Sequence, residues 1–126
     1  MIFDILTLFP NSFSYLNESM IKKAQEKDLI KINIHDLRKW SKDKHKKVDD
    51  RPFSGGPGML MQVEPIYRAL KDLGVYPERG SGVKVMLTSA KGLVWNQNVA
   101  SSFVKEENLK RVVIICGHYE GVDNRV

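Results

Sequence analysis

Apolar residues follow two alternating patterns along the chain, one typical of buried strands and the other of amphipathic helices. Short apolar runs predict strands over residues 2–8, 83–87 and 111–116, and alternation of apolar and polar residues predicts a strand over 29–34. Apolar residues spaced by three and four predict helices over residues 12–27, 64–73 and 96–107, and a short turn or helix is expected at 36–41. This order indicates one α/β domain with a mostly parallel sheet and helices on both faces.

Small and polar residues follow the third and fourth predicted strands, at 87–92 and 116–121. In open parallel sheets, ligands bind outside the carboxyl ends of the strands, so two such loops at one edge are a binding-site hypothesis. Ordinary strand-to-helix turns also use glycine, and spacing alone leaves both interpretations equally open. Neither loop contains a phosphate-binding or dinucleotide-binding glycine motif.

Residues 49–59 combine two aspartates, one arginine, two prolines and three glycines. Proline fixes φ and removes a backbone donor, while glycine lets a ligand approach the backbone closely. An ordinary surface loop is one interpretation. The charged start, the apolar end at 59–61 and the preceding basic run at 38–47 favour another, a rigid loop that presents backbone groups to a polar ligand.

The length of 126 residues and the formal charge of +5 fit one basic domain and suit a polyanionic partner. Cys116 is the only cysteine, so no intrachain disulfide forms, and its apolar surroundings predict a buried thiol in a reducing compartment. Apolar runs are shorter than the ~18–20 residues of a membrane span, and the start differs from a signal peptide. We therefore expect a cytoplasmic protein without a membrane partner.

Three motifs in this order resemble the bacterial TrmD family of tRNA (guanine-N1)-methyltransferases. They are Asp-Asp-Arg-Pro-Phe-Ser-Gly-Gly-Pro-Gly-Met-Leu-Met at 49–61, Leu-Thr-Ser-Ala-Lys-Gly at 87–92 and Cys-Gly-His-Tyr-Glu-Gly-Val-Asp-Asn-Arg at 116–125. The resemblance covers the whole chain. It implies a SPOUT-type domain with a trefoil knot, a homodimer, S-adenosylmethionine as cofactor, and methylation of the guanosine 3′ of the anticodon in tRNA.

The resemblance also assigns site residues. It places the cofactor against the two strand-end loops, at Leu87, Thr88, Ser89, Ala90, Gly117, Tyr119, Glu120 and Gly121. Glu120 faces the positive groups of the cofactor and is the one candidate Mg²⁺ ligand. The glycine-proline loop and the basic run are expected to contact RNA, the loop at the target guanine, through Asp50, Arg51, Gly55, Gly56, Pro57, Gly58, Lys42, Lys44, Lys46 and Lys47.

Members of this family continue well beyond the position of Val126, so the chain is expected to be an incomplete N-terminal SPOUT domain, 1–126, that stops before the knot is completed. The helical C-terminal domain is then absent. No catalytic residue is assigned: Asp49, Asp50 and Glu120 lie near the loops, but the family's general base lies beyond Val126. The chain alone is expected to be inactive.

This chain departs from the family's usual motifs at Ala90, Lys91 and His118, which stand where proline, glutamine and arginine are common. Lys91 adds a positive charge beside the expected sulfonium, and His118 replaces a permanent charge by a titratable one. Two alternatives remain: a non-catalytic basic module that binds tRNA, and a remnant with no ligand. His35 and His45 have no companions at metal-ligand spacing, so neither is assigned to a metal.

Overall fold

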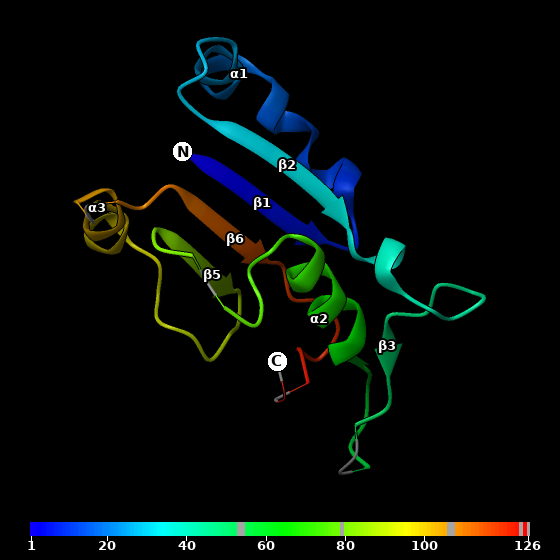
Figure 1. Cartoon of the computed structure of the whole chain (residues 1–126). Helices are drawn as coiled ribbons and strands as arrows, with labels where there is room; N and C mark the ends of the chain where they lie inside the picture. The colour runs from blue at the N-terminus through cyan, green and yellow to red at the C-terminus, as the bar shows by residue number, and fades with distance from the viewer. Residues whose placement is uncertain (53–54, 79, 106–107, 124, 126) are drawn as a thin grey trace.

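The computed structural model describes residues 1–52, 55–78, 80–105, 108–123 and 125, and its centre is a four-stranded parallel sheet. Strand order across the sheet is β2 (Lys31–Asp36), β1 (Ile2–Thr7), β6 (Arg111–Ile115) and β5 (Val83–Leu87) (Figure 1). The predicted fold class, a mostly parallel α/β sheet, is confirmed. All four strands run in the same direction, so their carboxyl ends share one edge.

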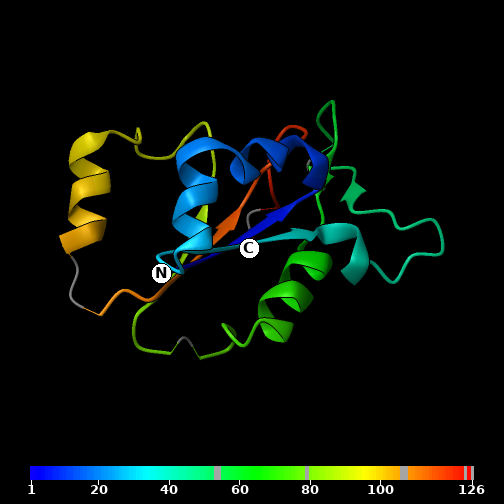
Figure 2. The ribbon, with the colours of Figure 1, turned by 90° about the horizontal axis from the view of Figure 1, so that it is seen from above.

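Helices cover both faces of this sheet, as predicted. The 3₁₀ segment η1 (Pro10–Asn17) and the helices α1 (Ser19–Glu26) and α3 (Gln97–Lys105) lie on one side, and α2 (Val63–Asp72) lies on the other (Figure 2). A second 3₁₀ turn, η2 (Leu37–Trp40), leaves β2 at the carboxyl edge. Among the described residues, no helix has the length and apolar character needed to cross a membrane.

The main core lies between the sheet and α2. It includes Leu6 and Val113 from the central strands and Ile66 and Ala69 from the helix, each at most 1% exposed. In contrast, α1 and α3 bury none of their described residues. Thus α2 and the sheet face beneath it form the rigid base from which the strand-end loops emerge.

A buried carboxylate on the α2 side of the sheet makes contacts with the two neighbouring strands. Asp4 is 1% exposed and accepts hydrogen bonds from Asn33 Nδ2 at 3.0 Å and Arg111 Nε at 2.7 Å, while His35 Nε2 lies 2.7 Å from its Oδ1. Arg111 also donates to the Leu73 carbonyl at 2.8 Å, beside the end of α2. Burial raises the pKa of Asp4, but the hydrogen bonds from Arg111, His35 and Asn33 outweigh it and leave that pKa lowered. The cluster ties three strands to α2.

A second, two-stranded antiparallel ladder closes the base of the glycine-proline loop. It pairs β3 (Asp49–Asp50) with β4 (Leu60–Met61), so the loop between them is a hairpin extension. Met61 is 1% exposed and belongs to the main core. This is the anchoring expected from the apolar end of that segment.

Three sequence expectations need correction. The predicted helix over 12–27 breaks into η1 and α1, because Glu18 is extended and Ser19 has φ 52°, and the residues Asn-Glu-Ser at 17–19 include two weak helix formers. The strand predicted over 29–34 instead begins at Lys31, paired to Ile2 of β1, and Leu29 stays 64% exposed. Cys116 is half-buried rather than buried, and its partial burial raises the pKa of its thiol.

Candidate functional site

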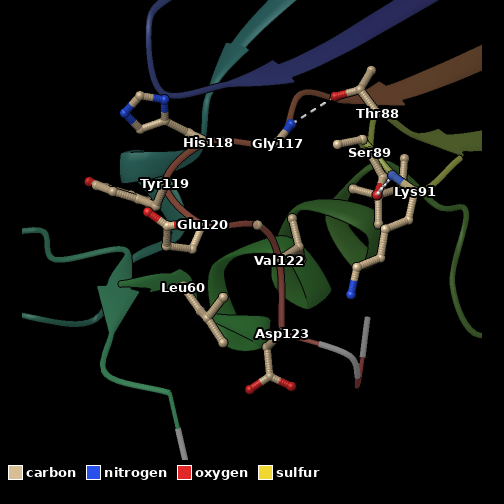
Figure 3. Close-up of a pocket in the computed structure, with 13 residues that line it drawn as sticks. Leu60, Thr88, Ser89, Lys91, Gly117, His118, Tyr119, Glu120, Val122 and Asp123 are labelled. Carbon is tan, nitrogen blue, oxygen red and sulfur yellow. Dashed lines mark hydrogen bonds between the residues drawn. The ribbon is translucent and has the colours of Figure 1, made fainter. Parts of the chain in front are cut away.

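An open cavity of about 760 Å³ lies at the carboxyl edge of the sheet, where the loops after β5 and β6 meet (Figure 3). All eight residues that the sequence assigned to a cofactor line this one cavity. The full lining consists of Leu60, Leu87, Thr88, Ser89, Ala90, Lys91, Gly117, His118, Tyr119, Glu120, Gly121, Val122 and Asp123. The two loops, about thirty positions apart in sequence, therefore build a single site.

The loops after β5 and β6 are joined directly at Gly117. Its backbone amide donates to Thr88 Oγ1 at 2.9 Å (Figure 3). The Thr88 amide in turn donates to the Ile115 carbonyl at 3.0 Å. A Cβ atom added at Gly117 would lie 2.9 Å from the Thr88 carbonyl oxygen, which is closer than a real Cβ approaches. Glycine is therefore required here for close packing of two backbones.

Residues 118–121 form a tight turn that sets the direction of three side chains. The Gly121 amide donates to the His118 carbonyl at 3.2 Å, and Tyr119 adopts φ 58°, a left-handed backbone that is uncommon for a residue with a side chain. His118, Tyr119 and Glu120 extend on the side away from Thr88, Ser89 and Lys91 (Figure 3). Strained backbone of this kind is concentrated at functional sites.

The glycine-proline loop is bonded to this turn through its apolar end. Glu120 donates its amide to the Met59 carbonyl at 3.1 Å, and Met61 donates to the Gly121 carbonyl at 3.0 Å. Gly58 has φ 90°, and a Cβ atom added there would lie 2.3 Å from Glu120 Cγ. The loop assigned to RNA and the loop assigned to the cofactor thus touch each other at Gly58 and Glu120.

Other residues expected to contact RNA occupy two further places. Asp50 and Arg51 line a smaller hollow of about 320 Å³ beside the first turn of α2, together with Asp123 and Arg125. The glycines and proline at 55–58 are exposed on the hairpin. The structure does not describe positions 53–54 of the same loop.

The four lysines at 42, 44, 46 and 47 are all exposed on a loop that follows η2 and projects away from the sheet (Figure 1). We call residues 42–47 the basic loop. Asp43 organises it, because its Oδ2 accepts the amides of His45 at 2.7 Å and Lys47 at 3.2 Å. The hydrogen bonds from Lys47 and His45 also lower the pKa of Asp43. The lysines are therefore presented by an ordered turn.

Five residues that line the cavity were not among the site residues assigned from the sequence. Lys91 and His118 were noted there only as departures from the family motifs, and Leu60, Val122 and Asp123 were missed. The Asp123 amide donates to the Met61 carbonyl at 3.2 Å, which places Asp123 between the two hollows. Its carboxylate receives Arg125 Nε at 2.9 Å and Nη2 at 2.7 Å, and these bonds lower its pKa to about 2. Val122 and Asp123 belong to the Gly-Val-Asp-Asn-Arg motif at 121–125, which the sequence does show. No local pattern, however, predicts that this segment pairs with β4.

Comparison with known proteins agrees with this geometry. Residues 1–126 match the family described as tRNA (Guanine-1)-methyltransferase TrmD. A relative from Clostridium botulinum (strain Kyoto / Type A2), named tRNA (guanine-N(1)-)-methyltransferase, is 47% identical over 97% of this chain and 48% of its own length. One of the same name from Endomicrobium trichonymphae is also 47% identical, over 97% of this chain and 54% of its own.

A solved structure shows the same arrangement in space. The crystal structure of tRNA (m1G37) methyltransferase from Aquifex aeolicus matches all of this chain and 55% of the other, with a TM-score of 0.78 and 36% identity. The chain thus spans about half the length of the relatives it matches. Its sheet, its strand-end cavity and the motifs that line the cavity together place it in the tRNA (guanine-1)-methyltransferase TrmD family, a family of the SPOUT type.

Proposed function

We propose that this chain supplies the cofactor-binding and RNA-docking part of a tRNA (guanine-N1)-methyltransferase. The reaction is transfer of a methyl group from S-adenosylmethionine to N1 of the guanosine 3′ of the anticodon. The observation that carries this proposal is that eight residues from two distant motifs line one cavity at the carboxyl edge of a parallel sheet. Membership of the family supports the same conclusion.

The cavity suits the proposed cofactor in size and chemistry. Its volume of about 760 Å³ lies within the range of roughly 300–1,000 Å³ typical of small-molecule sites. Leu87 and Val122 offer apolar walls for a flat adenine, and the close backbones at Gly117 and Thr88 offer polar groups for a ribose. The exposed carboxylate of Glu120 can attract the positively charged groups of the cofactor. When bound, S-adenosylmethionine supplies an activated methyl group on its sulfonium.

The basic loop is proposed to hold phosphates of the RNA backbone, which positions the substrate without reading its sequence. The glycine-proline loop then approaches the target guanine. Support comes from the exposure of all four lysines and from the turn that fixes their loop at the carboxyl edge of β2, beyond η2. The formal charge of +5 acts in the same direction.

Methylation at N1 requires removal of the proton that this nitrogen carries, so a general base must be present. Asp123 is a poor base near neutral pH, because Arg125 holds its pKa at about 2. The side chain of Asp50 accepts the Arg51 amide at 2.8 Å, and Glu120 bonds to the glycine-proline loop through its backbone amide. We propose that the base lies outside residues 1–126 and that the chain alone does not turn over.

Further parts of the proposal concern the metal, the assembly and the compartment. Glu120 would be the ligand that this chain gives to a Mg²⁺ ion. Within the described ranges, no three His, Cys, Asp or Glu side chains gather into a metal site, so the other ligands would come from substrate, water or other chain segments. We further propose a cytoplasmic homodimer in which residues 1–126 are the N-terminal part of the SPOUT domain.

One assay tests the function. Labelled S-adenosylmethionine and tRNA transcripts, with guanosine or adenosine 3′ of the anticodon, are incubated with two proteins. The first is this chain, and the second is this chain joined to the C-terminal half of the Clostridium botulinum relative, which we call the extended chain. We expect label at guanine N1 with the extended chain and none with the short one. A folded extended chain that binds tRNA but transfers no methyl group would contradict the proposal.

One observation favours a non-catalytic tRNA-binding module as the second candidate. Lys91 lies in the cavity wall, and its positive charge would repel the sulfonium of the cofactor. Calorimetry with S-adenosylmethionine separates the two functions. Heat of binding to this chain supports the enzyme, whereas tRNA binding without any cofactor binding supports the module.

A further inference from the structure

Three aromatic rings and one arginine lie next to one another along the carboxyl edge of the sheet. Arg38 lies over the ring of Phe9, with 5.8 Å between its Cζ atom and the ring centroid. The rings of Phe9 and His118 meet edge-on at 4.8 Å, and those of His118 and Tyr119 lie 4.5 Å apart. The four side chains join three separate segments of the chain, which are the connection between β1 and η1, the turn η2, and the turn after β6. We call Phe9, His118 and Tyr119 the aromatic row.

These rings are held firmly yet remain open to solvent. Phe9 is 46% exposed and Tyr119 is 42% exposed, and His118 is also exposed. The backbone under the row is fixed, because the His118 amide donates to Met61 Sδ at 3.2 Å and Arg38 donates to the Leu8 carbonyl. Tyr119 carries its ring on left-handed backbone, with φ 58°. Rings that served only to close the end of the sheet would be covered by the core.

An ordered, exposed aromatic row next to fixed positive charge matches the chemistry that binds unpaired nucleotides. Nucleobases splayed out of a helix stack on aromatic rings and on guanidinium planes, while nearby lysines hold the phosphates. Arg38 borders the aromatic row, and the basic loop begins four residues later along the chain. Stacking does not depend on base identity, since every base has a π-face.

We propose that the aromatic row stacks an unpaired nucleotide that neighbours the target guanosine in the RNA. This subsite rests on the proposed function, because it presumes that the strand-end cavity receives the target. His118 and Tyr119 belong to both places, as they line the cavity and continue the row outward. A flanking base on the row would hold the RNA strand open, with the neighbouring guanine directed to the cavity.

The experiment uses the whole chain and an anticodon stem-loop RNA in which 2-aminopurine replaces each nucleotide flanking the guanosine in turn. This fluorescent base is quenched when it stacks. The variants are Phe9→Leu and His118→Ala, which remove rings and keep the backbone hydrogen bonds. Tyr76→Leu is the matched control, because Tyr76 is 47% exposed and pairs edge-on at 5.1 Å with Tyr67 of α2, which is not part of the aromatic row.

We expect one flanking position to be quenched by the wild-type chain and by Tyr76→Leu. The quenching should disappear in Phe9→Leu and His118→Ala, with affinity about 5- to 150-fold weaker, which corresponds to roughly 1–3 kcal/mol per stacked base. The salt dependence of binding should stay unchanged, because stacking releases no counterions. S-adenosylmethionine affinity of Phe9→Leu should also stay unchanged.

Three results would overturn the subsite. If Phe9→Leu and His118→Ala bind and quench like the wild-type chain, the row only closes the end of the sheet, and the proposed function survives. If Phe9→Leu loses cofactor affinity instead of RNA affinity, the row serves the cofactor. If the wild-type chain shows neither quenching nor salt-dependent RNA binding, then both the subsite and the RNA part of the proposed function are wrong.

Discussion

Gly58 provides the sharpest test of how the two loops work together. Its φ of 90° is strained for any residue with a side chain, at a cost of about 1–2 kcal/mol. An alanine Cβ at this position would also lie 2.3 Å from Glu120 Cγ, and an ordinary contact starts at 3.4 Å. The two carbons would therefore have to separate by about 1 Å. Since Cγ is near the root of the side chain, the Glu120 carboxylate must leave its place.

Gly55 is the matched control for this substitution. It has φ 73° on the same hairpin, but a Cβ added there would meet nothing within 4 Å. Gly55→Ala should therefore show the backbone strain alone, with a melting temperature lower by roughly 3–8 °C, and Gly58→Ala should lose at least as much stability because of its added contact. Only Gly58→Ala should also weaken S-adenosylmethionine binding. Removal of one hydrogen bond to a charged group, about 1.5–3 kcal/mol, corresponds to about 10- to 150-fold in affinity.

Thermal unfolding and isothermal titration calorimetry of the two variants measure these effects. Methyl transfer by the extended chain adds a second readout, since a misplacement of about 1 Å at a reacting centre costs on the order of 10²-fold in rate. Equal cofactor affinities for folded Gly58→Ala and Gly55→Ala would refute the reasoning. The glycine-proline loop would then contact RNA alone and the strand-end loops the cofactor, as the family resemblance of the sequence motifs implies.

Three further predictions follow from the site and the core. Gly117→Val should abolish S-adenosylmethionine binding, because even its Cβ would press on the Thr88 carbonyl at 2.9 Å; calorimetry on a folded variant that shows normal binding would contradict this. Replacing the four lysines of the basic loop with serine should reduce the log–log salt slope of tRNA binding by roughly 0.7–0.9 for each phosphate that is no longer neutralised, and an unchanged slope would make the loop a solvated surface. Asp4→Asn should destabilise the fold by about 3–5 kcal/mol in urea unfolding at neutral pH, because Arg111 loses its buried partner. The folded state lowers the pKa of Asp4 from 3.8, so wild-type stability from this carboxylate is present above that pH and declines as pH falls below it; Asp4→Asn should lack that decline.

Much of the fold was predictable because its signals are local. The strand-like apolar runs and the helical spacing of Ile66 and Ala69 identify elements of the sheet and α2 without any partner. The break at Ser19 was not predictable in this way, since its left-handed φ overrides a helical pattern that continues on both sides. The start of β2 at Lys31 likewise depends on pairing with Ile2, which a single strand does not encode.

In the site, too, features with a local sequence signal were predictable and features that depend on long-range pairing were not. Gly117 and Thr88 lie in recognisable strand-end motifs, so their convergence at one edge follows from parallel strands. Leu60 and Asp123 were missed because they reach the cavity through backbone pairing between β4 and the segment after β6, a contact between positions about sixty residues apart. The approach of Gly58 to Glu120 depends on that pairing too.

Hydrogen–deuterium exchange on the 126-residue chain tests the central claim, that the strand-end cavity binds the cofactor. Exchange at each amide is compared with and without S-adenosylmethionine, and again with tRNA. We predict that the cofactor slows exchange at residues 87–91 and 117–121 and leaves the basic loop unchanged, while tRNA slows exchange in the basic loop. Protection by the cofactor elsewhere, or none at either strand-end loop, would contradict the account.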